Sequence, residues 1–367
     1  MIQVAKPSIG DEEISQAVKV LKSGNLVSGT KVYEFEELFK KFVGTNYCVA
    51  TNSGTSALHT TLQTLEIKKG DEVIVPSLTF FATIEAVLQC GAKPIFADID
   101  MNYWNMGFEQ IRDIITKKTK AVIPVHLFGM PVIDISKIMS FSTFYKFLFL
   151  VIEDCAQAHG AMLDNYSVGQ FGDFGCWSFF ATKPMTTIEG GAITTNMEDK
   201  TDLARKIINH GMSDRHTHEV LGYNYRMNEV SAAIGIIQLA KLERVTLTKH
   251  HNSIIIRERL KNISWLIPQK FNWLHQKPAW FWLAFRIDEE KLGYSTQVLI
   301  KKLRKEGIEV RYRYTEPLYK QPIFNGEYEN LDFPNVTKIA GKVIGLPNHP
   351  ELKEDEIDKI VDVIKKI

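Results

Sequence analysis

The chain has 367 residues, of which 45% are hydrophobic and 24% are charged, so it is long enough for two domains around a large buried core. Its formal net charge of +1 excludes the strongly basic surface that is typical of proteins binding nucleic acid or acidic membranes. We expect a cytoplasmic protein with reduced thiols, because the cysteines are scattered and the N-terminus is polar. The sequence also has no apolar run long enough to span a bilayer.

Short β-branched runs alternate with helical patterns through the first half of the chain. We expect helices at 55–65 and 81–91 and strands at 47–54, 71–77, 93–100, 120–129, 147–155, 175–180 and 191–196. This alternation predicts an α/β fold with a mostly parallel sheet, whose ligands bind at the carboxyl ends of the strands. The residues expected at such ends are Asn52, Ser53, Gly54, Pro76, Ser77, Asp98, His126 and Asp154.

The second part of the chain has a different pattern. Residues 229–262 have apolar positions at helical spacing and predict a long connecting helix. Strand-like pieces follow at 281–288 and 308–314, and a charged amphipathic helix is expected at 353–367. We therefore predict a large domain at 1–245 and a smaller α+β domain at 246–367.

The segment TNSGTSAL, residues 51–58, predicts a strand, a turn of small residues and the start of a helix. Backbone N–H groups and the hydroxyls of Ser53, Thr55 and Ser56 meet there at a helix N-terminus, which favours an anion such as phosphate. The segment lacks the spacing of a P-loop, and an ordinary capped turn is the alternative.

Asp154 closes an apolar strand, where its carboxylate would reach a ligand crevice; a helix N-cap is the alternative. Phe80 and Phe81 follow another strand end. Adjacent aromatic residues favour one ring in the core, and the other ring could then cover a flat ligand.

Lys183 lies in the segment SFFATKPMTTIEGG, after a predicted strand. In a closed pocket its amine would lose solvation and become a neutral nucleophile for a carbonyl group, whereas an exposed loop lysine is the alternative. Together with the anion turn, the aromatic ring and the carboxylate, this lysine matches the needs of pyridoxal phosphate (PLP). The histidines at 126, 210, 216 and 218 are too scattered for a zinc site, so we expect no metal.

Over nearly its whole length the chain resembles the DegT/DnrJ/StrS nucleotide-sugar aminotransferases, which have the fold-type I, aspartate aminotransferase-like architecture. The resemblance is carried in order by the segments TNSGTSAL, VIVPSLTFFAT, VIEDCAQAHGA, SFFATKPMTTIEGG and GYNYRMNEVSAAIG. It implies that PLP is the cofactor, with the pyridoxamine form as an intermediate.

The resemblance also implies roles for individual residues. Lys183 matches the lysine that forms the internal aldimine with PLP, Asp154 the acid at the pyridine nitrogen, and Gln157 the residue bonded to the ring hydroxyl. Phe80 matches the aromatic residue stacked on the ring. The phosphate ligands are matched by Gly54, Thr55, Ser56, Ser178 and Asn224, the last of these contributed by the other subunit of a homodimer.

Two departures from the family pattern are Ile188, where a glycine is common, and Pro184, where a polar residue is common. Because lysine stands at 183, where a dehydratase branch of the family has histidine, the resemblance implies transamination. The expected reaction moves an amino group from L-glutamate, giving 2-oxoglutarate, to a nucleotide-linked keto deoxysugar for surface polysaccharide or antibiotic sugars. Alternatives are a cyclitol aminotransferase, a PLP-dependent sugar dehydratase and a non-catalytic regulator that binds PLP or a sugar.

Overall fold

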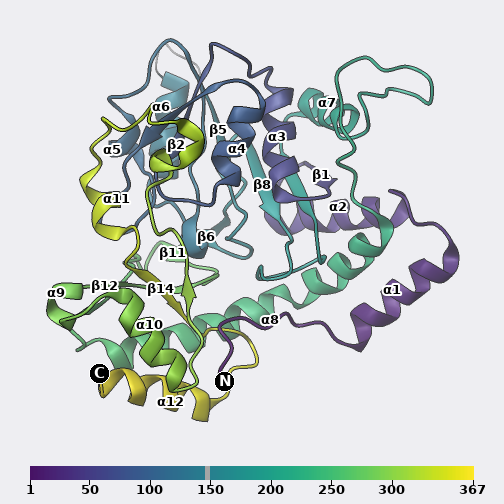
Figure 1. Cartoon of the computed structure of the whole chain (residues 1–367). Helices are drawn as coiled ribbons and strands as arrows, with labels where there is room; N and C mark the ends of the chain where they lie inside the picture. Colours follow the sequence, from purple (N-terminus) through teal and green to yellow (C-terminus); the bar gives the residue numbers. More distant parts are fainter. Residues whose placement is uncertain (145–148) are drawn as a thin grey trace.

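A seven-stranded sheet forms the centre of the molecule in the computed structural model, which describes residues 1–144 and 149–367 (Figure 1). The strand order is β1-β9-β8-β5-β4-β2-β3, and within the described residues β9 alone runs antiparallel to its neighbours. The prediction of a mostly parallel α/β sheet is therefore confirmed. The strands are β1 (Tyr47–Thr51), β2 (Glu72–Pro76), β3 (Lys93–Ala97), β4 (Thr119–Val122), β5 (Leu150–Asp154), β8 (Phe174–Ser178) and β9 (Gly191–Thr195).

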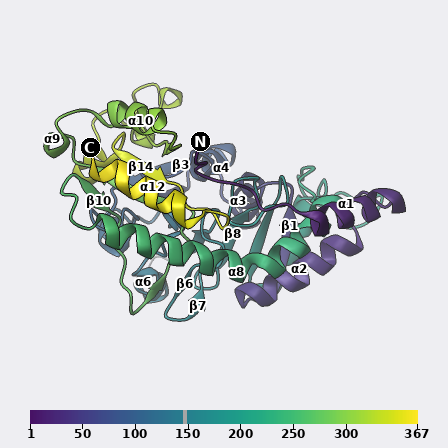
Figure 2. The same ribbon diagram turned by 90° about the horizontal axis from the view of Figure 1, so that it is seen from below.

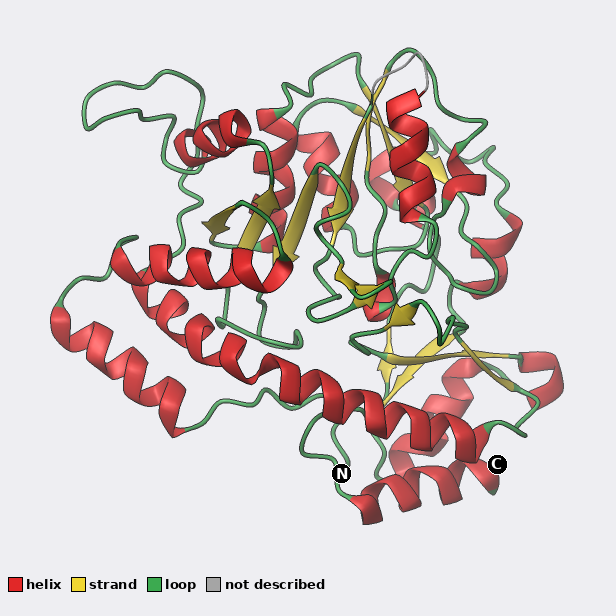
Figure 3. Cartoon of the chain, turned by 180° about the vertical axis from the view of Figure 1, so that it is seen from behind, coloured by secondary structure: helices red, strands yellow, loops and turns green. Residues whose placement is uncertain are grey.

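Helices cover both faces of this sheet, because successive strand residues point to opposite sides (Figure 3). Cys176 in β8 packs into the core beneath α3 and α4, whereas its neighbour Trp177 packs into the core formed with α2 and α8. The helices of this part are α1 (Asp11–Ser23), α2 (Thr30–Val43), α3 (Gly54–Thr64), α4 (Ala82–Gln89), α5 (Phe108–Ile111), α6 (Ile135–Phe144), α7 (Glu198–Ile207) and α8 (Glu229–Leu260). Within the described residues, no helix combines the length and the apolar character needed to cross a membrane.

The observed strands are shorter than the predicted ones, and two of them illustrate the difference. The strand predicted at 120–129 ends at Val122, and the chain beyond it turns through a 3-10 helix at Leu127–Gly129. Pro124 provides a reason, because proline has no N–H to donate to a ladder. The strand predicted at 147–155 is β5, from Leu150 to Asp154, and residues 147 and 148 lie outside the described part of the chain.

The C-terminal residues build a second, antiparallel sheet with the order β10-β12-β14-β13. Its strands are β10 (Leu266–Pro268), β12 (Leu283–Ile287), β13 (Arg311–Tyr312) and β14 (Val343–Leu346). A small sheet β11-β6-β7 lies nearby, with β6 (Met162–Leu163), β7 (Tyr166–Ser167) and β11 (Gln276–Lys277). The remaining helices are α9 (Glu289–Leu292), α10 (Thr296–Lys305), α11 (Pro334–Ile339) and α12 (Glu354–Lys365), with 3-10 turns at Leu318–Lys320 and Pro322–Phe324.

The long helix α8 runs beneath both parts of the molecule (Figure 2). Its first half contributes Leu242 to the core with α2, and its second half contributes Ile256 and Leu260 to the core of the C-terminal sheet. Ile2 also packs into this second core, so the N-terminal residues join the C-terminal part. Residue 245 lies inside α8, and the division of the chain at that point stays a prediction.

Candidate active site

A cavity of about 280 Å³ lies at the carboxyl edge of the central sheet. It is bounded by the ends of β5 and β8, by the N-terminal turn of α3, by the residues just before β12 and by residues in and after β13. The structure thus brings together most of the residues predicted to form one site. Those lining the cavity are Gly54, Thr55, Phe80, Asp154, Gln157, Ser178 and Lys183.

The N-terminus of α3 forms one wall of this cavity. Ser53 caps the helix, because its hydroxyl accepts a hydrogen bond from the backbone N–H of Ser56 at 3.1 Å. In the described part of the chain the N–H groups of Gly54 and Thr55 have no acceptor, and both residues line the cavity. Free N–H groups also occur at the start of an ordinary capped helix, but here they belong to residues that line a cavity, where they suit an anion.

Gly54 is the residue that allows this wall to approach the sheet. A Cβ atom at this position would lie 2.6 Å from Cβ of Ser178, which is closer than real carbon atoms pack. The N-terminus of α3 and the end of β8 therefore meet at a distance that only glycine permits. The hydroxyl of Ser178 faces the cavity at this point of contact.

Ser56 was predicted to bind the same phosphate, and its hydroxyl is already engaged. It donates to Oδ1 of Asn52 at 2.6 Å and lies 2.8 Å from the hydroxyl of Ser53, and the side chain is buried. Ser56 does not line the cavity, so its contribution to a phosphate site stays a prediction.

Asp154 projects its carboxylate into the cavity from the end of β5. Oδ2 accepts a hydrogen bond from the hydroxyl of Thr83 at 2.8 Å, and Oδ1 accepts one from the backbone N–H of Ala156 at 3.1 Å. Burial raises the pKa of Asp154, while the bond from Thr83 and the nearby Lys183 lower it. In the described residues that directly follow β5 no helix begins and the next element is β6, so the alternative role of Asp154 as an N-cap is wrong.

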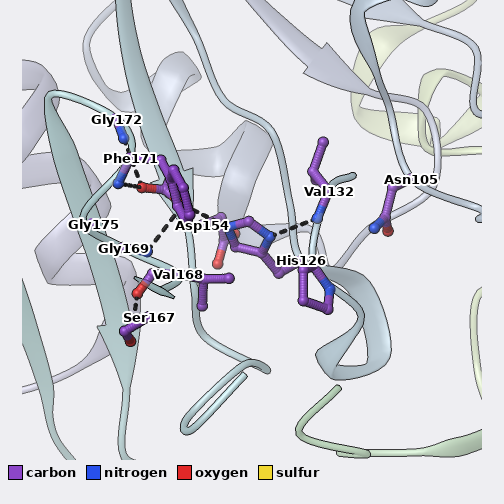
Figure 4. Close-up of polar contacts among 12 residues, drawn as sticks. Asn105, His126, Val132, Asp154, Ser167, Val168, Gly169, Phe171, Gly172 and Gly175 are labelled. Carbon is purple, nitrogen blue, oxygen red and sulfur yellow. Dashed lines mark hydrogen bonds and ion pairs between the residues drawn. The ribbon is translucent and has the colours of Figure 1, made fainter. Parts of the chain in front are cut away.

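Glu153, next to Asp154, points to the opposite side of β5, toward the loop that carries Gly169, Phe171 and Gly172. Figure 4 shows this loop, together with His126 and its bond to Val132. The carboxylate of Glu153 accepts hydrogen bonds from the backbone N–H groups of Gly169, Phe171 and Gly172 at 2.7–2.9 Å. Nε2 of His126 lies 2.9 Å from Oε2 of Glu153. Nδ1 of His126 accepts from the N–H of Val132, so Nε2 carries the proton that bonds Glu153.

His126, Glu153 and Cys155 place one potential metal ligand each within 4.8 Å of one another. The free lone pair of His126 is taken by the N–H of Val132, and both oxygens of Glu153 accept backbone N–H groups. Burial raises the pKa of the Cys155 thiol well above its ordinary value, which favours the protonated form over a thiolate ligand. His126 is therefore a buried histidine with both ring nitrogens hydrogen-bonded.

Lys183 faces Asp154 across the cavity, which encloses its half-buried side chain. Loss of hydration and the charges of Arg311 and Arg313 outweigh the opposing effect of Asp154 and lower the pKa of its amine to about 8. Nζ lies 4.6 Å from the ring centroid of Phe281. The side chain is therefore half-buried in the cavity and not on an exposed loop, and the lowered pKa increases the neutral fraction of the amine; its role as the nucleophile stays a prediction.

Hydroxyl groups hold the loop that carries Lys183. Oγ1 of Thr186 donates to the carbonyl of Phe179 and accepts from the N–H of Ile188, and Oγ1 of Thr187 donates to the carbonyl of Glu189. Ile188, at the position where the family often has glycine, has a φ of 73°. This left-handed backbone is unfavourable for a β-branched residue, so the loop keeps the glycine conformation despite the substitution.

Gln157 lies at the floor of the cavity between two partners. Its Oε1 accepts from the backbone N–H of Phe128 at 2.9 Å, and its Nε2 donates to the hydroxyl of Tyr314 at 3.1 Å. The second hydrogen of Nε2 remains for a ligand, which agrees with the predicted bond to the ring hydroxyl. Burial raises the pKa of Tyr314 to about 12, so this phenol stays neutral.

Several cavity residues were not predicted as site residues: Thr83, Phe281, Trp282, Arg311, Arg313 and Tyr314. Arg311, Arg313 and Tyr314 lie in the segment predicted as strand-like at 308–314, whose hydrophobic pattern does not indicate which of its side chains face a ligand. Asp98, also expected at a strand end, instead accepts the N–H groups of Asn335 and Val336 at the start of α11. Asn224 lies outside the cavity of its own chain, and its predicted role across a dimer stays a prediction.

The residues that are present fit PLP on four observations. The free N–H groups at Gly54 and Thr55 suit its phosphate, and the buried Asp154 carboxylate suits a cationic ring nitrogen. The amine of Lys183 suits its aldehyde. Phe80, which is 52% exposed at the rim, suits its ring, while its neighbour Phe81 packs against the core.

Comparison with known proteins gives the same assignment along the whole chain. The model of the DegT/DnrJ/EryC1/StrS aminotransferase family matches residues 7–365. The chain is 33% identical to the spore coat polysaccharide biosynthesis protein SpsC of Bacillus subtilis, over 98% of this chain and 95% of the relative. It is 32% identical to the GDP-perosamine synthase of Vibrio cholerae, over 100% of this chain and 98% of the relative.

A solved structure has the same fold. The sugar aminotransferase Spr1654 of Streptococcus pneumoniae, described as putative, superposes with a TM-score of 0.91 and 26% sequence identity, over 100% of this chain and 98% of its own. That protein has been solved in a PLP form and in a PMP form. The agreement extends over both the central sheet and the C-terminal sheet, since the superposition covers both chains almost completely.

Proposed function

Because this chain belongs to the DegT/DnrJ/EryC1/StrS aminotransferase family, we propose that it transfers an amino group from L-glutamate to a keto group on a nucleotide-linked deoxysugar. It is an aminotransferase with PLP as its cofactor. The observation that carries the proposal is the placement of Lys183 and Asp154 on one cavity, with the helix N-terminus at Gly54 between them. Bound PLP supplies an electron sink that stabilises negative charge developing on the donor carbon.

The burial and the hydrogen bonds of Lys183, Asp154 and Gln157 support a separate role for each of them. The neutral amine of Lys183 would hold the aldehyde carbon of the cofactor. Once released, it would carry a proton between the donor carbon and the cofactor in one half-reaction, and between the cofactor and the acceptor carbon in the other. Asp154, held by Thr83 and Ala156, keeps a proton on the ring nitrogen. Gln157 and the N–H groups of Gly54 and Thr55 fix the orientation of the ring and exclude water from it.

An anionic acceptor is supported by the positive charge on one side of the cavity. Arg311 and Arg313 line it, and neither has a carboxylate partner in the described part of the chain. The guanidinium of Arg311 lies 5.1 Å from the ring centroid of Phe281 and stays available for an anion. The relative that makes GDP-perosamine supports a sugar linked to a nucleotide.

A homodimer is supported by apolar side chains that remain exposed around the cavity. Phe180 on its rim is 44% exposed, Ile188 in the Lys183 loop is 57% exposed, and Leu221 on the loop after α7 is 75% exposed. The same loop carries Asn224, whose carbonyl accepts from Nδ2 of Asn52 beside the α3 N-terminus. A second copy that covers these side chains would complete the phosphate site with its own Asn224.

The deciding experiment is an amino-transfer assay with glutamate against a panel of 3-keto and 4-keto nucleotide sugars, with keto cyclitols as the competing class. Borohydride reduction should attach the cofactor irreversibly to Lys183, and Lys183→Ala should lose both the adduct and turnover. Lys305→Ala, at an exposed position on α10, is the matched control and should retain both. Transamination by Lys183→Ala would contradict the proposal, and turnover of cyclitols alone would correct its substrate.

A further inference from the structure

A groove of about 520 Å³ lies beside the cofactor cavity. It is formed by the N-terminal segment at Val4 and Ala5, by helix α10 and by strand β13 with the residues around it. Figures 1 and 2 both show the start of the chain close to α10. Thr182, Arg311 and Arg313 line the groove and the cofactor cavity alike, so the two spaces adjoin one another.

Four cationic side chains line this groove. We call it the basic groove and define it by Lys301, Arg304, Arg311 and Arg313. Lys301 and Arg304 are three positions apart on α10, which places them on one face of that helix. Arg311 lies in β13 and Arg313 directly follows that strand. Two elements of the C-terminal part therefore direct positive charge into the same space.

The charges of the basic groove are not neutralised by the protein. In the described part of the chain none of the four cations forms an ion pair with a carboxylate. Among the described residues that line the groove, Glu309 is the one acid, and its Oε2 accepts the backbone N–H of Val4 at 3.0 Å. Like charges held close together repel, so such a cluster indicates an anion as its partner.

The volumes of the two spaces show which part of a ligand each can hold. Pockets that enclose a whole small-molecule ligand measure roughly 300–1,000 Å³. The cofactor cavity, at about 280 Å³, lies below this range, so beside the cofactor it has room for only the reacting end of an acceptor. The basic groove lies within the range and adjoins the cavity, so the remainder of the acceptor extends into the groove.

The arginines of the groove lie close to the reacting amine. The guanidinium of Arg311 lies 5.1 Å from the ring centroid of Phe281, and Nζ of Lys183 lies 4.6 Å from the same centroid. The charges of Arg311 and Arg313 also contribute to the lowered pKa of Lys183. A ligand that reacts at Lys183 therefore places its next group beside Arg311.

We propose that the basic groove binds the diphosphate linker of the acceptor, whose keto sugar then lies in the cofactor cavity. Each phosphate of such a linker carries negative charge near neutral pH, and a guanidinium binds two phosphate oxygens at once. Glutamate has no diphosphate, so Lys301 and Arg304 act on the acceptor and not on the donor. The inference rests on the proposed function in taking a nucleotide-linked sugar as the acceptor.

The first test measures binding to the holoenzyme, whose cofactor occupies the helix N-terminus at Gly54. Lys301→Glu and Arg304→Glu reverse one charge each in the groove, and Lys305→Glu is the matched control at an exposed position of α10 outside the groove. UDP and GDP should bind at least about tenfold more weakly to either groove variant and unchanged to the control. Uridine and guanosine, which lack phosphate, should not distinguish the variants.

The second test separates the two half-reactions. With glutamate, the loss of the visible absorbance of the cofactor should proceed at the wild-type rate in Arg304→Glu. With a keto nucleotide sugar, KM should rise at least about tenfold while kcat changes little, and Arg304→Lys should restore most of the loss. A merely structural role of Arg304 would slow both half-reactions together.

Three results would overturn the basic groove as the diphosphate site. They are equal weakening of UDP and GDP binding by Lys305→Glu, an unchanged affinity in both groove variants, and a crystal structure of the holoenzyme with UDP whose diphosphate lies away from α10. A wild-type protein that aminates only cyclitols or free keto sugars would overturn the proposed function. The titrations with UDP and GDP would then still decide whether the groove binds a diphosphate.

Discussion

Substitution of Gly54 by alanine tests whether the close contact between α3 and β8 sets the shape of the active site. The added Cβ would lie 2.6 Å from Cβ of Ser178 and 3.2 Å from its Cα and Oγ, whereas carbon atoms pack at about 3.5–4.0 Å. Ser178 cannot retreat, because β8 pairs with β5 on one side and β9 on the other. The helix N-terminus must therefore move outward, away from the cavity.

The expected loss follows from two opposing effects. Overpacking of this kind destabilises a core by about 1–3 kcal/mol, and alanine returns up to about 1 kcal/mol of helix propensity relative to glycine. We therefore expect Gly54→Ala to lower the free energy of unfolding by about 1–2 kcal/mol. Urea unfolding of the cofactor-free protein measures this loss, and a fluorescence titration measures the accompanying loss of PLP affinity.

A double-mutant cycle gives the refutable result. Ser178→Gly removes the Cβ that the new methyl group would strike, so it should recover at least about 1 kcal/mol in the Gly54→Ala background. Ser178→Ala keeps that Cβ and removes only the hydroxyl, so it should recover little. Equal recovery by both variants, or strict additivity in the Ser178→Gly cycle, would show that the contact is not the cause.

Three further changes test the groups around Asp154 and Lys183. Thr83→Val should raise the pKa of Asp154 and weaken PLP binding about tenfold or more, because a hydrogen bond to a charged group is lost. The control is Thr60→Val, which changes a buried hydroxyl without a partner among the described residues and should preserve binding. Between pH 8 and 10.5 the unfolded chain binds more protons at Lys183, so unfolding free energy should rise with pH in the cofactor-free protein, and less steeply in Lys183→Met. Ile188→Gly should raise the unfolding free energy by about 0.5–1 kcal/mol in thermal or urea unfolding, by relief of its left-handed backbone.

The part of the site that the sequence could predict comes from strand ends. Ser178 and Asp154 each close a β-branched or apolar run, and parallel strands bring such ends to one edge whatever the details of packing. The helix N-terminus at Gly54 follows β1 directly, so its place at the same edge was also determined locally. Register between the strands was not needed for these predictions.

The residues that were missed reach the cavity from places that local patterns do not connect. Thr83 lies in the first turn of α4 and acts on Asp154, 71 positions later in the chain. Phe281 and Tyr314 belong to the C-terminal part, whose docking against the central sheet depends on tertiary packing of α8 and β12. The hydrophobic pattern of the sequence places Phe281 beside a predicted strand. It does not predict that Nζ of Lys183 lies 4.6 Å from the centroid of the Phe281 ring.

Strand ends also predicted too much, as Asp98 shows. Its carboxylate is suited to bind a ligand, but it instead accepts the N–H groups of Asn335 and Val336 at the N-terminus of α11. The choice between ligand and neighbour depends on whether an unpaired donor lies within about 3 Å, which is decided by the three-dimensional structure. Sequence can therefore identify the edge that carries a site more reliably than the members of that site.

Glu153 and Asp154 are adjacent carboxylates with different roles, because Glu153 binds backbone N–H groups of a loop and Asp154 faces the cavity. Side chains alternate across β5, so Glu153 turns toward the loop after β7 and Asp154 toward the cavity. Glu153 accepts from three backbone N–H groups and from His126, which occupies its oxygens with fixed partners. Asp154 accepts from Thr83 and Ala156 among the described residues, which leaves lone pairs on its carboxylate for a cation in the cavity. The backbone of Asp154 is also held, because its N–H donates to the Pro124 carbonyl and its carbonyl accepts from the His126 N–H. Together with the hydrogen bonds of Glu153, these bonds fix the end of β5 and so the orientation of the Asp154 carboxylate toward the cavity.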